Sequence, residues 1–194
     1  MIKLDEVKNV KFNVAKITRI ALSTAFIVIG AQLAIPTIPP VTLQTLCIFI
    51  TAVILSPTEA LISSLIYVLL GIVGAPVFSS FSGGIGIVLN VGGGFIISFP
   101  VIAFVVSTLR RKFRSSAFTH AFTFSIATLI AYIFGALWID IMGYYEGSFW
   151  KMLTVYVLPF LPFDAIKIAV ATLCSMKLEK IFKNGKKKTE NNKA

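Results

Sequence analysis

Ionisable and catalytic side chains are scarce in this 194-residue sequence. It holds only 8 Asp and Glu residues, one histidine and two cysteines, and charged residues make up 13% of it. His120 belongs to no HExxH motif, and Cys47 and Cys174 lack the CxxC spacing of redox and zinc sites. No set of nucleophile, base and orienting group can be assembled from these residues. The sequence therefore predicts no catalytic site, no metal site and no cofactor.

A phosphate-binding loop is also missing. The glycine-rich stretch at residues 83–94 contains no GxxxxGK[ST] sequence and lacks the third glycine of a dinucleotide-binding loop. Two interpretations of its glycines remain, a flexible linker and a backbone that packs closely against a ligand or another helix. We expect no ATP site in this chain.

Long hydrophobic runs are what the sequence does have. Hydrophobic residues make up 57% of it, a composition that excludes an ordinary soluble domain. The runs predict an all-α integral membrane protein, a bundle of six transmembrane helices at residues 17–35, 43–55, 58–74, 93–109, 120–142 and 161–182. The second run is short for the ~20 residues that a spanning helix needs, so tilt or the preceding residues must complete it.

The basic residues are distributed unequally between the connections. Of 18 Lys and Arg, sixteen lie at or before Arg19, between the fourth and fifth spans, or after residue 176. The positive-inside rule therefore predicts that both termini are cytoplasmic. The chain divides into a basic segment at 1–16, a membrane domain at 17–182 and a polar basic tail at 183–194 that we expect to be disordered. Because the basic residues flank apolar spans, they favour contact with the lipid bilayer and not with nucleic acid.

An acid and a base lie three positions apart in the last span. Asp164 and Lys167 share one face of a helix at this spacing, and ionisable groups in a membrane segment are costly enough to indicate a functional site. Asp164 is 18 residues from position 182, or ~27 Å at the rise of a helix, which is level with the long outer loops at 36–42, 75–92 and 143–160. We therefore expect a ligand pocket at the outer face. The structural alternative is a helix-capping Asp164 neutralised by Lys167.

Four stretches together resemble the BioY family, the biotin-specific S component of energy-coupling factor (ECF) transporters. They are IPTIPPVTLQT at 35–45, GIVGAPVF at 71–78, SGGIG at 82–86 and LPFDAIK at 161–167. The resemblance covers nearly the whole chain, from about residue 19 to 178. One departure is the loop NVGGG at 90–94, where the family usually has GPTGG, so Asn90 is predicted to supply a compensating amide.

The resemblance implies a six-helix S component in the cell membrane of a prokaryote, which captures biotin outside and has no ATPase of its own. Its partners would be a transmembrane T component and two ATP-binding subunits. Ala21 and Ala25 match the small-residue signature with which the first helix of S components docks on the T component, although their spacing alone favours packing inside the bundle.

The predicted ligand site follows from the chemistry of biotin. Asp164 can accept hydrogen bonds from the ureido N–H groups, and Lys167 can donate to a carbonyl or carboxylate. Further residues predicted to line the site are Gln44, Tyr67 and Asn90, and those predicted to form a loop over the ligand are Gly83, Gly84 and Gly86. Two alternatives stay open, an S component for another vitamin and a structural membrane protein with a buried Asp–Lys pair.

Overall fold

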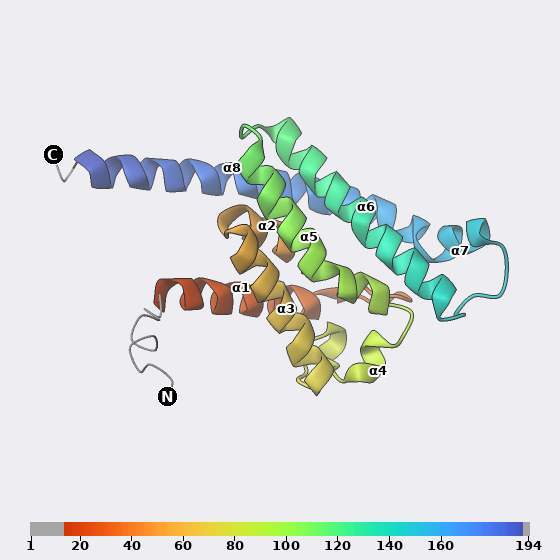
Figure 1. Cartoon of the computed structure of the whole chain (residues 1–194). Coiled ribbons are helices and arrows are strands. Elements are labelled where there is room, and N and C mark those ends of the chain that lie inside the picture. The colour runs from red at the N-terminus through yellow and green to blue at the C-terminus, as the bar shows by residue number, and fades with distance from the viewer. Residues whose placement is uncertain (1–13, 192–194) are drawn as a thin grey trace, which may run out of the picture.

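The computed structural model describes residues 14–191 and is almost entirely α-helical (Figure 1). Its helices, in chain order, are α1 (Val14–Gln32), α2 (Gln44–Ile54), α3 (Pro57–Val73), α4 (Ile85–Val88), α5 (Gly93–Lys112), α6 (Ala117–Ile141), α7 (Phe149–Tyr156) and α8 (Leu161–Asn191). Two short 3-10 helices, η2 (Ser79–Phe81) and η3 (Leu158–Phe160), precede α4 and α8. A two-stranded antiparallel hairpin of β1 (Ala34–Ile35) and β2 (Val41–Thr42) connects α1 to α2.

Local sequence signals account for several helix boundaries. α3 begins with a capping box, in which Ser56 accepts the backbone N–H of Glu59 and the Glu59 side chain accepts the backbone N–H of Ser56. It ends at Gly74, whose φ of 108° is a left-handed conformation that favours glycine. Ser116 caps α6 by accepting the backbone N–H of Thr119.

The predicted all-α membrane class is confirmed. Among the described residues, four segments are long and apolar enough to cross a membrane, namely Val14–Gln32, Gly93–Lys112, Ala117–Ile141 and Phe149–Ile181. The two shorter apolar helices are α2 and α3, which correspond to the predicted second and third spans. The count of six membrane crossings therefore stays a prediction.

The connections carry more helix than the sequence predicts. The segment 143–160, expected to be an outer loop, contains α7 and η3. α7 is held by Met152, which packs in a small apolar cluster with Ala136 and Ile139 of α6. The last helix also continues beyond the predicted boundary at residue 182, because α8 ends at Asn191. The expectation of a disordered tail therefore fails for residues 183–191, and residues 192–194 lie outside the described part of the chain.

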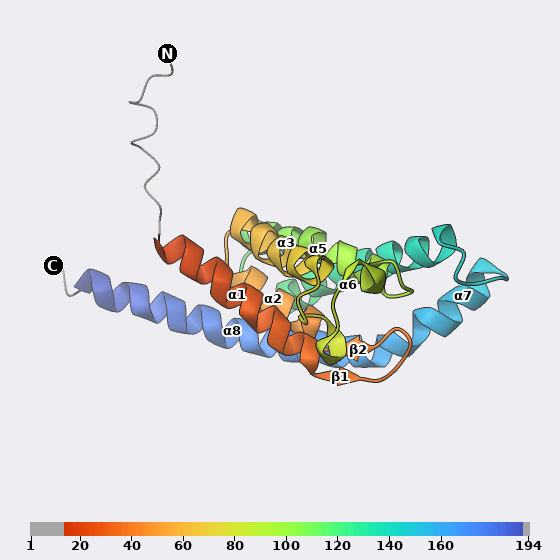
Figure 2. The same ribbon diagram turned by 90° about the horizontal axis from the view of Figure 1, so that it is seen from below.

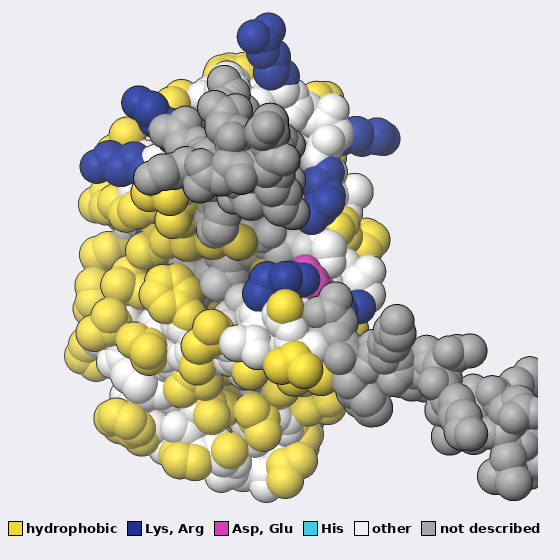
Figure 3. Space-filling view, turned by 90° about the vertical axis from the view of Figure 1, so that its left-hand side faces the viewer, with side chains coloured by type: hydrophobic (Ala, Val, Ile, Leu, Met, Phe, Trp, Pro, Cys, Tyr) yellow, Lys and Arg dark blue, Asp and Glu magenta, His cyan; other side chains and the backbone are white. Residues whose placement is uncertain are grey.

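α5 is the central helix of the bundle and packs against α2, α3 and α6. α8 lies against α2 and α6, and α1 lies against α2 and α3. In both ribbon views, α1 begins and α8 ends at one end of the molecule, while the hairpin and α7 lie away from that end (Figures 1 and 2). Viewed from that end, the surface carries a gathering of Lys and Arg side chains (Figure 3).

Candidate ligand-binding site

A cavity of about 700 Å³ lies where the hairpin, α5, α6 and α8 converge. Its walls come from the turn of the hairpin, the beginning of α2, the segment 78–82, the connection at 87–92, and the facing sides of α5, α6 and α8. This volume is in the range of small-molecule sites. The predicted position, near the first turn of the last helix and beside the Pro- and Gly-rich loops, agrees with the position of this cavity.

Asp164 and Lys167 form the charged part of the cavity wall. Both lie in the first two turns of α8, and their side chains are buried, with relative exposures of 7% and 6% for the two residues. Lys167 Nζ donates to Asp164 Oδ1 at 2.8 Å, as the predicted placement on one helix face requires. Asp164 also lies in the first turn of α8, where the helix dipole stabilises a negative charge.

Tyr132 completes this cluster and was missed by the sequence analysis. Its hydroxyl donates to Asp164 Oδ2 at 2.6 Å, and its side chain lines the same cavity. Both carboxylate oxygens of Asp164 therefore have a donor inside the protein, which fixes the orientation of the carboxylate. The Asp164–Lys167–Tyr132 cluster presents to the cavity the remaining lone pairs of the carboxylate and the remaining N–H donors of Lys167, because the single O–H of Tyr132 is already donated to Asp164.

Gln44 lines the cavity from the first residue of α2, and Tyr67 stands behind it. Thr42 donates to Gln44 Oε1 at 2.6 Å, and Gln44 Nε2 donates to the Tyr67 hydroxyl. That hydroxyl donates in turn to the carbonyl of Val77 at 3.2 Å, and the Tyr67 ring is fully buried. Tyr67 is not among the residues that line this cavity, and its hydroxyl holds Gln44 in place.

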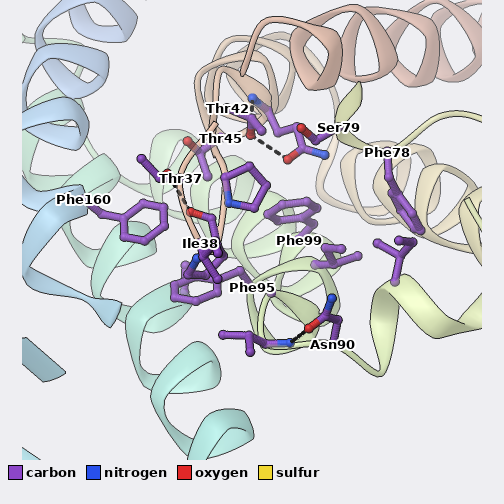
Figure 4. A pocket seen from close by; sticks show the side chains of 18 of the residues that line it. Thr37, Ile38, Thr42, Thr45, Phe78, Ser79, Asn90, Phe95, Phe99 and Phe160 are labelled. Atoms are coloured by element: carbon purple, nitrogen blue, oxygen red, sulfur yellow. Dashed lines mark hydrogen bonds between the residues drawn. The ribbon is translucent and has the colours of Figure 1, made fainter. Parts of the chain in front are cut away.

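Asn90 lies on the cavity wall, as predicted, in the connection between α4 and α5. Its Oδ1 accepts the backbone N–H of Val91 at 2.7 Å (Figure 4). Its backbone carbonyl accepts the indole N–H of Trp138 at 3.1 Å. Its side-chain oxygen thus shapes the loop, and the amide N–H₂ is the part left to face a ligand.

The glycines Gly83, Gly84 and Gly86 are not among the residues that line the cavity. A Cβ on Gly83 would lie 2.3 Å from the carbonyl oxygen of Ala75, and Gly84 has a φ of 99°. Both positions therefore need glycine for the backbone itself. That these glycines form a loop over the ligand stays a prediction.

Aromatic side chains make up much of the remaining wall. Phe78, Phe95, Phe99 and Phe160 surround the space from three different segments, with Phe95 and Phe99 both on α5 (Figure 4). Phe95 and Phe160 stack with ring centroids 5.5 Å apart, so they join α5 to the segment just before α8. A largely apolar cavity with a few convergent polar groups is the usual composition of a site for a small organic ligand.

Ala21 and Ala25 are not among the residues that line this cavity. Both are exposed on α1, whereas the buried residues of this helix are Ser23, Thr24, Ile27, Gly30 and Ala31. Their packing inside the bundle, which spacing alone favours, is therefore not what the fold contains. Among residues 14–181, whose side chains the structure describes, no group of three or more His, Cys, Asp or Glu side chains is arranged to hold a metal ion.

Comparison with known proteins gives one consistent family. The chain is 34% identical to the biotin transporter BioY of Thermotoga maritima, over 86% of this chain and 96% of the relative. It is 31% identical to the biotin transporter BioY2 of Lactococcus lactis, over 84% of this chain and 88% of the relative.

A solved structure supports the same relationship. The fold matches the crystal structure of the S-component for biotin from an ECF-type ABC transporter with a TM-score of 0.76 and 25% identity, over 86% of this chain and 92% of the other. The BioY family matches residues 6–184, which is nearly all of the sequence. From its residues, its fold and these relatives, the chain belongs to the BioY family.

Proposed function

We propose that this chain is the biotin-binding membrane subunit of a vitamin uptake transporter. It captures biotin at the outer face, and partner subunits drive the import with ATP. The observation that carries this function is the buried Asp164–Lys167–Tyr132 cluster at one side of an otherwise aromatic cavity. The relatives named as biotin transporters support the choice of ligand, and a transporter subunit of this family is not an enzyme.

The cavity and biotin have matching chemistry. The ureido ring of biotin carries two N–H donors and a carbonyl, and Asp164 accepts the N–H groups with the lone pairs that Lys167 and Tyr132 leave open. Lys167 donates to a carbonyl or carboxylate oxygen of the ligand. The thiophane ring and the valeryl chain then lie against the phenylalanines.

Three further groups complete the proposed site. Gln44, held by Thr42 and Tyr67, offers its amide to the ligand from a fixed position. Asn90 offers its amide N–H₂ from the connection above α5. Gly83, Gly84 and Gly86 form a loop over the ligand in this proposal, next in the chain to the segment 78–82 that lines the cavity. These assignments make the site specific by a few polar groups in an apolar enclosure.

The proposed topology is six crossings of the cell membrane of a prokaryote, with both termini in the cytoplasm. The gathering of Lys and Arg at the end where α1 begins and α8 ends supports this orientation (Figure 3). The cavity then lies toward the outer face. The basic segment 1–16 and the tail 183–194 fall on the cytoplasmic side of the membrane domain 17–182 in this proposal.

Energy for import comes, in this proposal, from an ECF transmembrane T component and two ATP-binding subunits. The exposed positions of Ala21 and Ala25 on α1 support a contact there, because small residues allow a second helix to approach closely. The description of the matched structure as part of an ECF-type ABC transporter supports the same assembly.

Titration of the purified chain with biotin, without ATP or partners, tests the proposed function. We expect saturable binding with one biotin per chain, since all proposed ligand contacts lie within this chain. A panel of other water-soluble vitamins is the control. Saturation with another vitamin and none with biotin would assign the chain to a different S component. Binding of no vitamin by folded protein would favour a structural Asp164–Lys167 pair.

A further inference from the structure

A second hollow of the molecule lies between α6 and α8, which cross and pack against each other (Figure 1). It is a groove of about 560 Å³, lined by residues within positions 125–132 of α6 and 161–168 of α8. The groove opens to the outside of the bundle, because Leu129 and Leu161 in its lining are 58% and 45% exposed.

Small side chains on the two helix faces leave this space open. Along α6, Ser125, Leu129 and Tyr132 recur at spacings of four and three residues, so they share one face of the helix. Along α8, Ala165 lies in the lining between Leu161 and Ile168 with the same kind of spacing. Ser125 and Ala165 are both exposed and too short to fill the gap between the helices.

The groove lies at the depth of the hydrocarbon core. Both helices belong to segments that are long and apolar enough to cross a membrane, Ala117–Ile141 and Phe149–Ile181. Positions 125–132 are in the middle of the first segment, roughly 12 Å from its nearer end at ~1.5 Å per residue. A hydrocarbon core ~30 Å thick therefore covers this part of α6, and lipid chains surround the groove there.

Apolar side chains form most of the surface that the groove turns toward the lipid. Leu129 and Leu161 are exposed, as are Pro162 and Ala165, and Ile168 is half-buried. Dispersion attraction grows with the number of atoms in contact. A hydrocarbon chain in the groove touches protein on more than one side, so it gains more contacts there than on the convex surface of a single helix.

The polar groups at the floor of the groove are already paired. The Thr128 hydroxyl donates to the carbonyl of Phe124 at 2.9 Å, and the Tyr132 hydroxyl donates to Asp164 Oδ2 at 2.6 Å. The other carboxylate oxygen of Asp164 accepts from Lys167. A hydrocarbon chain over this floor therefore leaves each of these groups with its partner, as buried polar groups require.

We propose that the groove between α6 and α8 binds the acyl chain of a membrane lipid, which covers the Tyr132–Asp164 hydrogen bond from the bilayer. Thr128, Tyr132 and Asp164 line both this groove and the ligand cavity, so the two sites share a wall. The acyl chain closes that wall on its outer side. The inference rests on the membrane class and on the contact between α6 and α8, and not on biotin as the ligand.

Photolabelling of the full chain in phosphatidylcholine vesicles tests this site. The probe is phosphatidylcholine with a diazirine on one acyl chain, and mass spectrometry locates the labelled residues. Leu137 of α6 and Leu173 of α8 are the references for Leu129, because they are 50% and 62% exposed but do not line the groove. Probes with the diazirine at successive chain carbons compare each leucine at its own depth. We expect Leu129 to be labelled severalfold more than either reference.

Two results of this comparison would overturn the proposal. Equal labelling of the three leucines would mean that lipid passes over the groove as over any exposed surface. Weaker labelling of Leu129 would mean that protein covers the groove, for example a helix of a second copy of this chain. Neither result depends on biotin, so this experiment is independent of the titration that tests the proposed function.

The variant Ala165→Trp fills the groove with a side chain of the protein itself. Ala165 lines the groove but not the ligand cavity, and we expect labelling of Leu129 to fall severalfold. The matched control is Ala169→Trp, one turn farther along α8 at an exposed position outside the groove, which should leave the labelling unchanged. Undiminished labelling in Ala165→Trp would overturn the proposal. The comparison of the three leucines in the unmodified chain decides it even where this variant fails to fold.

Discussion

The change Asp164→Asn removes the charge of the polar cluster while keeping the shape of the side chain. The carboxylate accepts from Lys167 at 2.8 Å and from Tyr132 at 2.6 Å. An asparagine amide keeps one carbonyl acceptor but puts N–H₂ where the other oxygen stood. The new N–H₂ group then faces another donor, which is Lys167, Tyr132 or a ureido N–H of the ligand. We therefore expect effects on both ligand affinity and stability.

The effect on affinity follows from the loss of a hydrogen bond to a charged group. Such a bond contributes about 1.5–3 kcal/mol, which at about 1.4 kcal/mol per tenfold corresponds to a Kd for biotin about 10- to 150-fold higher. Stability should fall as well, because Lys167 is buried and loses its counter-charge. Removing one partner of a buried ion pair costs about 3–5 kcal/mol, an upper bound here since asparagine still accepts from Lys167.

Calorimetric titration and thermal unfolding in detergent measure these two effects separately. In the double variant Asp164→Asn with Lys167→Met, no unpaired charge remains, so we expect stability to recover while biotin binding stays weak. Lys151→Met is the matched control, because Lys151 is exposed on α7 and outside the cavity. Folded Asp164→Asn protein that binds biotin as tightly as the unmodified chain would refute the role of Asp164 in the site.

Three further outcomes are expected. Tyr132→Phe removes the hydrogen bond that orients Asp164, a loss of about 1 kcal/mol, and should raise the Kd for biotin about fivefold in the same titration. An unchanged Kd would show that Asp164 is oriented without this bond. Glu179→Gln should lower the free energy of unfolding by about 1–3 kcal/mol, since Arg110 loses its counter-charge. Biotin affinity should stay unchanged, because neither residue lines the cavity, and lost affinity would contradict this. Ala25→Trp should leave biotin binding unchanged but impair ATP-driven uptake. The control Ala169→Trp, at an exposed position of α8, should leave both binding and uptake unchanged. Equal uptake by the two variants would exclude this face of α1 from the coupling interface.

The helical membrane class and one half of the site could be predicted because both leave local patterns in the sequence. Apolar runs of sufficient length predict spanning helices, and α1, α5, α6 and α8 follow those runs. Asp164 and Lys167 are three residues apart on one helix, so their contact follows from helix geometry alone. The connections gave no such pattern, and α7 owes its position to Met152, whose packing partners lie on α6.

The other half of the site depends on contacts between segments far apart in the chain. Tyr132 meets Asp164 across 32 positions, and no spacing within either helix indicates this. Tyr67 was predicted to line the site because it lies in a span, but its depth is set by Gln44 in front of it and by the carbonyl of Val77. Such placements need the register of one helix against another, which the sequence alone does not define.

One helix face of α8 nevertheless carries more information than the Asp–Lys pair revealed. Asp164, Lys167, Ala171, Ser175 and Glu179 fall on the same side of this helix, at spacings of three and four residues. This face carries polar residues at both ends and a small residue, Ala171, in the middle. The facing side of α6 has the same order of polar and small residues in the opposite direction. Because an apolar face would pack as well against lipid as against protein, polar groups are what make this helix pair specific. The pattern therefore identifies the side of α8 that faces the protein. The Asp164–Lys167 pair lies along it, and so does Glu179, which contacts Arg110 and His120.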